Sequence, residues 1–94
     1  MVERRCTVAE LARTVQGNVL GDPDVVVTSV CSESKRVEPG ALFCCVRGER
    51  ADGHRFAAAA VQSGAVALLV DHELPPDVPQ IVVEDVRAAM GPVL

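Results

Sequence analysis

The apolar residues of the chain fall into blocks with two different periods, and the first block has the period of a helix. Its members are Val8, Leu11, Ala12 and Val15. This spacing predicts an amphipathic helix over residues 7–15. Thr7 is followed three residues later by Glu10, which is the pattern of a capping box. The helix is therefore expected to start at Thr7 and to run to about Val15, with Gly17 as its stop signal.

The later blocks are continuous or β-branched apolar runs, which are typical of strands. A short run at 18–20 predicts an edge strand, and the valine-rich run at 24–31 predicts a longer strand. Residues 41–46 form an unbroken apolar run, so this strand is expected at the centre of a sheet with both faces buried. The runs at 65–70 and 80–83 predict two more strands.

Two further helices are predicted, over 54–63 and, capped by Asp85, over 85–90. The inner stripe of the first is Phe56, Ala57, Ala60 and Val61. A helix between two buried runs predicts a right-handed crossover joining parallel strands. The chain is therefore expected to fold as one domain over residues 1–94. Its fold class would be α/β, a small three-layer domain with a mostly parallel or mixed sheet of about four to five strands flanked by helices.

Charge and aromatic content narrow the possible partners. The net charge is −4 and aromatic residues make up 2% of the chain, which argues against a nucleic-acid-binding protein. Residues 35–55 nevertheless carry five basic and three acidic side chains. Such a patch suits one or two phosphates held locally, although solvated surface charge explains it equally well.

The four cysteines are Cys6, Cys31, Cys44 and Cys45. They lack a Cys-x-x-Cys spacing, which argues against zinc, and they are expected to be reduced and to pack as small apolar residues. Cys44 and Cys45 are adjacent on a predicted strand and should point to opposite faces. No apolar signal segment or membrane span is evident, so a cytoplasmic location and no membrane contact are expected.

Polar loops at 32–39 and 47–53 flank the central strand, and each follows a predicted strand. Ligands of open α/β sheets bind beyond the carboxyl ends of strands, so the two loops are predicted to form one site for an anionic small molecule. Ser32 and Ser34 lie two residues apart and offer hydroxyl donors. The alternative is that these hydroxyls satisfy the backbone of their own turn.

No catalytic residue and no metal ligand is predicted. Gly48 and Gly53 have the spacing of a phosphate loop, but His54 and Arg55 stand where that loop needs Lys and Ser or Thr. His54 and His72 are far apart in sequence with no supporting cluster, so a structural role or a position at the rim of the site is the preferred interpretation of His54. Spacing alone assembles no nucleophile and base.

Four short motifs follow one another in the central part of the chain: Glu33-Ser34-Lys35, Pro39-Gly40, Leu42-Phe43 and Asp52-Gly53-His54. In this order they resemble the N-terminal domain of the Mur ligases of peptidoglycan synthesis, whose marker triplet is Asp-Ser-Arg. The resemblance extends over residues 8–90. Within the family it is strongest to the ligase that adds the third residue of the stem peptide (MurE). The ligase that adds D-Ala-D-Ala (MurF) is the second choice.

The resemblance implies a module that anchors the UDP part of a UDP-N-acetylmuramoyl-peptide. The implied contacts are Ser32, Ser34, Glu49, Arg50 and Ala51. In such ligases ATP and Mg²⁺ bind a central domain and a third domain brings the amino acid, so the chain is expected to be part of a longer ligase and inactive alone. The alternative is a stand-alone α/β interaction or regulatory module that has lost the ligand.

Overall fold

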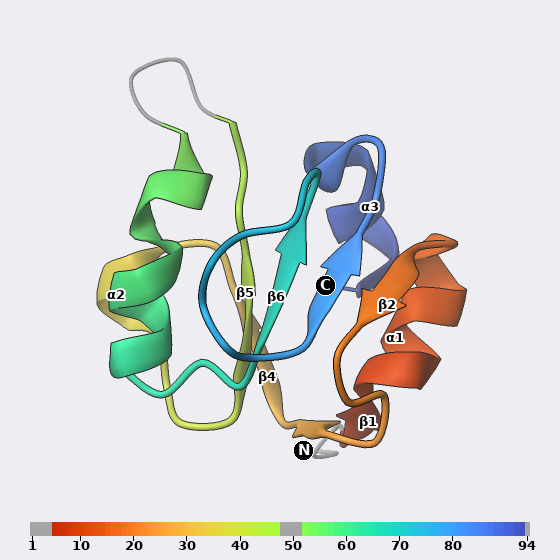
Figure 1. The fold of residues 1–94 in the computed structure, drawn as a ribbon, viewed down its shortest axis with the longest axis horizontal. Coiled ribbons are helices and arrows are strands. Elements are labelled where there is room, and N and C mark those ends of the chain that lie inside the picture. The colour runs from red at the N-terminus through yellow and green to blue at the C-terminus, as the bar shows by residue number, and fades with distance from the viewer. Residues whose placement is uncertain (1–4, 48–51, 94) are drawn as a thin grey trace.

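The computed structural model describes residues 5–47 and 52–93 and shows a sheet with helices on both faces (Figure 1). The helices are α1 (Val8–Val15), α2 (Ala57–Gln62) and α3 (Val86–Val93), with 3₁₀ turns η1 (Ser34–Arg36) and η2 (Gly53–Phe56). The strands are β1 (Cys6–Thr7), β2 (Asn18–Leu20), β3 (Val26–Val27), β4 (Ser29–Cys31), β5 (Ala41–Cys44), β6 (Ala67–Val70) and β7 (Gln80–Val82). Within the described residues no helix is long and apolar enough to cross a membrane.

The main sheet has five strands in the order β2-β7-β6-β5-β4. The last four of these, from β7 to β4, run parallel, and β2 joins the edge antiparallel to β7. Every residue of β5 and β6 is buried, as the unbroken apolar runs predicted. The expected mixed α/β sheet is thus confirmed.

Alternate residues of the central strands pack into two separate hydrophobic cores, one on each face of the sheet. Leu42, Cys44 and Leu69 pack on the face covered by α1 and α3. Phe43 and Cys45 pack on the opposite face, under α2. The three-layer arrangement and the opposite orientation of the two adjacent cysteines follow from the period of two along a strand.

The capping box at the start of α1 is confirmed. The backbone N–H of Glu10 donates to Oγ1 of Thr7 at 3.2 Å, and the backbone N–H of Thr7 donates to Oε1 of Glu10 at 3.2 Å. The expected stop at Gly17 is one residue late, because Gln16 already takes the left-handed conformation at φ 56°. Gly17 has a packing role instead: a Cβ there would lie 2.6 Å from Cγ2 of Ile81.

The single strand expected over 24–31 is wrong. Val26–Val27 leaves the main sheet to pair with Cys6–Thr7, and Ser29–Cys31 pairs with β5. The break falls at Thr28, whose backbone N–H donates to the carbonyl of Gly40 at 2.9 Å. Two different pairing partners therefore divide one β-branched run.

The inner stripe expected for the helix over 54–63 is partly wrong. Its first turn is the 3₁₀ turn η2, in which side chains repeat every three residues. The buried positions are His54, Ala57 and Ala60, each three apart, and Phe56 is 42% exposed. The tighter turn rotates Phe56 away from the core.

The buried thiols yield a chemical prediction. All four cysteines are free, and burial raises the pKa of Cys44 and of Cys45 to about 12. At pH 8 a thiol reagent should label the partly exposed Cys6 and Cys31 within minutes and leave the other two unreacted, because the thiolate is the reactive form. Denatured, unreduced protein should yield all four thiols. Rapid labelling of four thiols in the folded chain would contradict the predicted protection.

Candidate functional site

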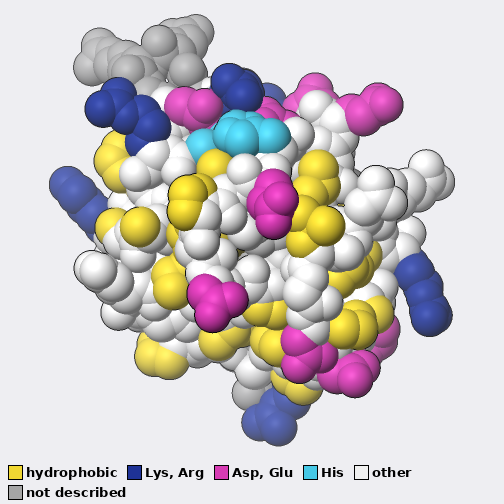
Figure 2. Space-filling view, in the orientation of Figure 1, with side chains coloured by type: hydrophobic (Ala, Val, Ile, Leu, Met, Phe, Trp, Pro, Cys, Tyr) yellow, Lys and Arg dark blue, Asp and Glu magenta, His cyan; other side chains and the backbone are white. Residues whose placement is uncertain are grey.

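The carboxyl ends of β5, β6 and β7 bring polar side chains to one edge of the sheet, at the top of Figure 1. Arg47 and Asp52 lie in the connection after β5, Asp71 and His72 directly follow β6, and Glu84 lies after β7. Figure 2 shows histidine side chains at this end of the molecule, beside acidic and basic groups. In this type of fold such an edge is where ligands bind.

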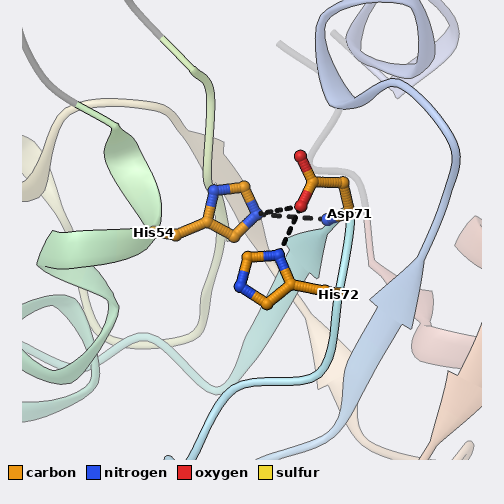
Figure 3. Close-up of side chains that lie close together, drawn as sticks. All are labelled: His54, Asp71 and His72. Atoms are coloured by element: carbon orange, nitrogen blue, oxygen red, sulfur yellow. Dashed lines mark hydrogen bonds and ion pairs between the residues drawn. The ribbon is translucent and has the colours of Figure 1, made fainter.

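His54, Asp71 and His72 form a cluster at this edge (Figure 3). Oδ1 of Asp71 lies 2.5 Å from Nδ1 of His72 and 3.2 Å from Nε2 of His54. The two imidazole rings stack, with centroids 4.7 Å apart and planes 16° apart. The expectation that neither histidine has a supporting cluster is therefore wrong, because parallel pairing of β5 with β6 joins residues distant in sequence.

His54 is buried and both of its ring nitrogens have partners. The backbone N–H of Asp71 donates to Nε2 at 3.1 Å, so Nε2 is an acceptor. The ring proton then lies on Nδ1, which donates to Oδ1 of Asp52 at 2.5 Å. The same carboxylate oxygen accepts the backbone N–H of His54 at 3.0 Å. The imidazole thus joins the turn after β5 to the end of β6, in line with the expected structural role.

Arg47 holds two carboxylates at once. Its Nε donates to Oδ2 of Asp71 at 2.5 Å and its second terminal nitrogen donates to Oδ1 at 3.2 Å, which is a bidentate pair. Its other terminal nitrogen lies 3.2 Å from Oδ2 of Asp52. The hydrogen bond from Arg47 is the main reason that the pKa of Asp71 lies well below its usual range. The backbone N–H of His54 is the main cause of the lowered pKa of Asp52.

The backbone that follows β5 also pairs with the backbone at the start of η2. Arg47 and Asp52 form an antiparallel bridge, and the N–H of Gly53 donates to the carbonyl of Val46 at 2.7 Å. A Cβ on Gly53 would lie 2.7 Å from the backbone nitrogen of Val46. Gly53 is therefore required for this close approach. The φ of Gly53 is not positive, so it is the packing space and not a left-handed conformation that requires glycine here.

The geometry of the cluster favours hydrogen bonding over metal chelation. The donor atoms of His54, Asp71 and His72 lie within 4.8 Å of one another. An imidazole lone pair lies in the plane of its ring, and two stacked, nearly parallel rings cannot both direct lone pairs at one ion. Chelation would also break the bond from the Asp71 N–H to His54.

Two cavities lined by described residues open at this edge. One of about 700 Å³ is lined by the end of α1, the end of β7 and the carboxylates of Asp71, Glu84 and Asp85. The other, of about 400 Å³, lies between Arg47 and Arg87 and includes the same three acids. Because the guanidinium of Arg47 is already paired with carboxylates, neither cavity offers an anion a free pair of arginines.

The predicted substrate-binding residues lie at the neighbouring strand ends. Ser32 is exposed just after β4, and Ser34 starts η1 and is partly buried. In the described part of the chain neither hydroxyl has a protein partner, which argues against the alternative that they only satisfy their own turn. Glu49, Arg50 and Ala51 lie outside the described residues. Neither serine lines the two cavities.

A comparison of this chain with known protein families identifies the family to which it belongs. A profile of the Mur ligase family, catalytic domain, matches residues 26–93, more than half of the chain. The chain belongs to the Mur ligase family. This confirms the resemblance drawn from the motifs around Ser34 and His54.

Mur ligases of both expected types are among the relatives. The UDP-N-acetylmuramoyl-tripeptide–D-alanyl-D-alanine ligase of Escherichia coli is 39% identical over 90% of this chain. The UDP-N-acetylmuramoyl-L-alanyl-D-glutamate–2,6-diaminopimelate ligase of Geobacillus thermodenitrificans is 47% identical over 76% of it. The chain covers 19% and 14% of these Mur ligases, respectively.

Solved Mur ligase structures share the fold. MurF from Acinetobacter baumannii superposes with a TM-score of 0.87 at 28% identity, covering 97% of this chain and 20% of that one. MurF from Thermotoga maritima, solved in complex with ADP, has a TM-score of 0.61 at 29% identity over 66% of this chain and 14% of that one.

The tautomer of His54 is a testable consequence of the hydrogen bonds. Long-range proton–nitrogen spectra at pH 8 should show His54 protonated on Nδ1, with Nε2 as an unprotonated acceptor. Spectra of His72→Gln assign the remaining ring to His54. A His54 ring that carries its proton on Nε2 would contradict the assigned hydrogen-bond directions.

The lowered pKa of Asp71 predicts acid sensitivity. Asp in an unfolded chain titrates near pH ~4. A group with a lower pKa in the folded state stabilises the fold fully above that value and loses this contribution as the pH falls toward the folded pKa. Between pH 7 and pH ~2.5, the urea midpoint of Asp71→Asn should therefore fall less than that of the wild type.

Glu84→Gln is the matched control, since Glu84 is exposed on the same edge and has no ion pair among the described residues. The urea midpoint of Glu84→Gln should show the same pH dependence as that of the wild type. Identical pH dependence of wild type and Asp71→Asn would show that the ion pair does not stabilise the fold.

Proposed function

We propose that this domain anchors the UDP part of a UDP-N-acetylmuramoyl-peptide for an ATP-dependent Mur ligase. The observation that carries the proposal is the pair of hydroxyls on Ser32 and Ser34 at the carboxyl end of β4, which have no hydrogen-bond partner among the described residues. The next strand, β5, leads into the segment that contains Glu49, Arg50 and Ala51. Family membership supports reading these adjacent loops as one substrate site.

The chemistry of these residues suits the ligand. A diphosphate needs several hydrogen-bond donors and positive charge, and a uracil edge needs a few fixed polar partners. The two serine hydroxyls supply donors, and Arg50 supplies charge. Binding the nucleotide end of a long substrate positions the distant peptide end for reaction, so an anchoring domain contributes to the rate without touching the reacting atoms.

The complete enzyme would join an amino acid to the peptidoglycan stem peptide in the cytoplasm. ATP, Mg²⁺ and the incoming amino acid would bind the remaining ligase domains, which are the partners of this one. The ligase that adds the third residue remains the first assignment, because the higher identity is to a diaminopimelate-adding relative. The D-Ala-D-Ala-adding type is the second candidate, favoured by the wider coverage of its relative.

Titration with UDP tests the proposed site directly. NMR shifts should concentrate in residues 30–56, and binding should be weak, because the other domains of the ligase would add contacts. Ser34→Ala should weaken UDP binding about tenfold by removing one donor. Arg50→Glu should weaken it further, with an effect that shrinks as salt is added.

Ser63→Ala is the matched control for Ser34→Ala. Ser63 is exposed at the end of α2, and its loss should leave UDP affinity unchanged. Shifts confined to residues outside 30–56, or no shifts at millimolar UDP, would favour an interaction module without the ligand.

A further inference from the structure

We propose that Cys31 is a positioning residue for UDP binding. Its thiol holds the backbone of Glu33, the residue that separates Ser32 from Ser34, by two hydrogen bonds. The inference rests on the proposed function, because the two serines are among the proposed substrate contacts. It concerns only the part of that site that the described residues form.

The thiol of Cys31 bonds to both polar groups of the Glu33 backbone. Its S–H donates to the carbonyl of Glu33 at 3.0 Å, and its sulfur accepts the N–H of Glu33 at 3.4 Å. A thiol is a weak donor and a weak acceptor, and here it uses both functions on one residue. The N–H belongs to the peptide group that follows Ser32, and the carbonyl belongs to the one that precedes Ser34. Both peptide groups are therefore held relative to the end of β4.

The carbonyl of Glu33 is also the first acceptor of the 3₁₀ turn η1. It accepts the backbone N–H of Arg36 at 3.0 Å. A carbonyl oxygen has two lone pairs, so it can accept from the thiol and from this N–H together. Glu33 is the N-cap residue of η1, but its own side chain makes no capping hydrogen bond. The thiol of Cys31 is thus the side chain that links β4 to the turn that begins at Ser34.

The other end of the turn is held by packing. Val37 directly follows η1, is partly buried and packs against the core under α2, which contains Phe43 and Ala60. The turn is therefore fixed at its end by apolar contacts and at its start by hydrogen bonds from Cys31. Loss of the thiol would release the start, where both serines lie.

A second interaction spans the turn but is weaker in kind. Nε of Arg36 lies 2.9 Å from Oε2 of Glu33, and the two side chains are 81% and 64% exposed. Ion pairs between side chains this exposed contribute little to stability, because water and salt screen them. Cys31 is only partly buried too, but its bonds reach the backbone itself. The thiol therefore determines the geometry at the start of the turn.

A fixed Glu33 backbone limits the relative positions of the two serine hydroxyls. Neither hydroxyl has a partner within residues 5–47 and 52–93. A turn that already has its bound conformation loses less conformational entropy when a ligand binds, so pre-organisation raises affinity without a new contact. Cys31 would therefore strengthen UDP binding through the turn and not by touching the ligand.

The test compares Cys31→Ala and Cys31→Ser with Cys6→Ala in the 94-residue chain. Cys6 is the matched control, since it is the other partly exposed free cysteine and has no hydrogen bond from its thiol among the described residues. Calorimetric titration with UDP should show a loss of affinity of about three- to fivefold for Cys31→Ala and less than about twofold for Cys6→Ala.

Cys31→Ser is the conservative variant that separates positioning from packing. Its hydroxyl keeps a donor and an acceptor at the same place, so UDP affinity should stay within about twofold of the wild type. A role of Cys31 in packing alone does not predict this rescue. Equal affinity of wild type and Cys31→Ala, or equal losses in Cys31→Ala and Cys31→Ser, would overturn the proposal.

A double-mutant cycle with Ser34→Ala identifies the route. If Cys31 acts by placing the hydroxyl of Ser34, its loss should matter less once that hydroxyl is gone. Cys31→Ala combined with Ser34→Ala should then lose less UDP affinity than the product of the two single losses. A combined loss equal to that product would overturn the assigned route.

Hydrogen exchange measures the hold on the turn without ligand. The N–H of Arg36 donates to the carbonyl of Glu33, and its exchange should accelerate about fivefold in Cys31→Ala, while the N–H of Leu68 in β6 keeps its rate. Unchanged exchange at Arg36 would overturn the role of the thiol. A wild-type chain whose exchange depends on Cys31 as expected, but which fails to bind UDP, would overturn the proposed function instead.

Discussion

The parallel pairing of β5 with β6, buried on both faces, is the constraint on which the rest of the domain depends. Leu42, Phe43 and Cys44 pair with Ala67, Leu68 and Leu69, and none of these residues reaches solvent. A parallel pair of strands needs a crossover connection, and the connection from β5 to β6 contains α2. Strands buried on both faces also need helices on both faces: α2 covers one face of the sheet, and α1 and α3 cover the other. The helices therefore follow from the sheet.

Small residues make this cover possible in a chain with few aromatics. Ala57 and Ala60 of α2 belong to the same core as Phe43, which is the largest buried side chain among the described residues. At the end of α2, Gly64 takes φ 118°, and a Cβ there would lie 2.7 Å from Cα of Pro39. Alanine and glycine let the backbones approach closely, so the thin layer of α2 still excludes water from the sheet.

The same pairing creates the edge of the sheet at which the candidate site lies. Since β4, β5, β6 and β7 run parallel, their carboxyl ends meet, and the polar residues after them become neighbours. One part of this edge is internally satisfied, with Arg47, Asp52, His54 and Asp71 bonded to one another. In the part next to β4, the hydroxyls of Ser32 and Ser34 have no partner within residues 5–47 and 52–93. The first part stabilises the fold, and the second is where we propose that the substrate binds.

The sequence by itself determined the elements that depend on near neighbours. Helical spacing and the Thr7–Glu10 box located α1, unbroken apolar runs located β5 and β6, and a period of two placed Cys44 and Cys45 on opposite faces. Motifs within a few residues of one another also indicated the family. Each of these signals is read within about one turn or one strand, where local geometry is fixed by the backbone.

Only the tertiary structure decided which distant segments meet. Val26–Val27 left the main sheet because Cys6–Thr7 offered another partner, and Phe56 turned outward because η2 has a tighter pitch than an α-helix. His54 joined Asp71 and His72 because their strands are neighbours in the sheet order. The placement of His72 directly after a predicted strand was the one available signal. Strand order is set by the burial of whole faces, a property of the folded chain that no local pattern contains.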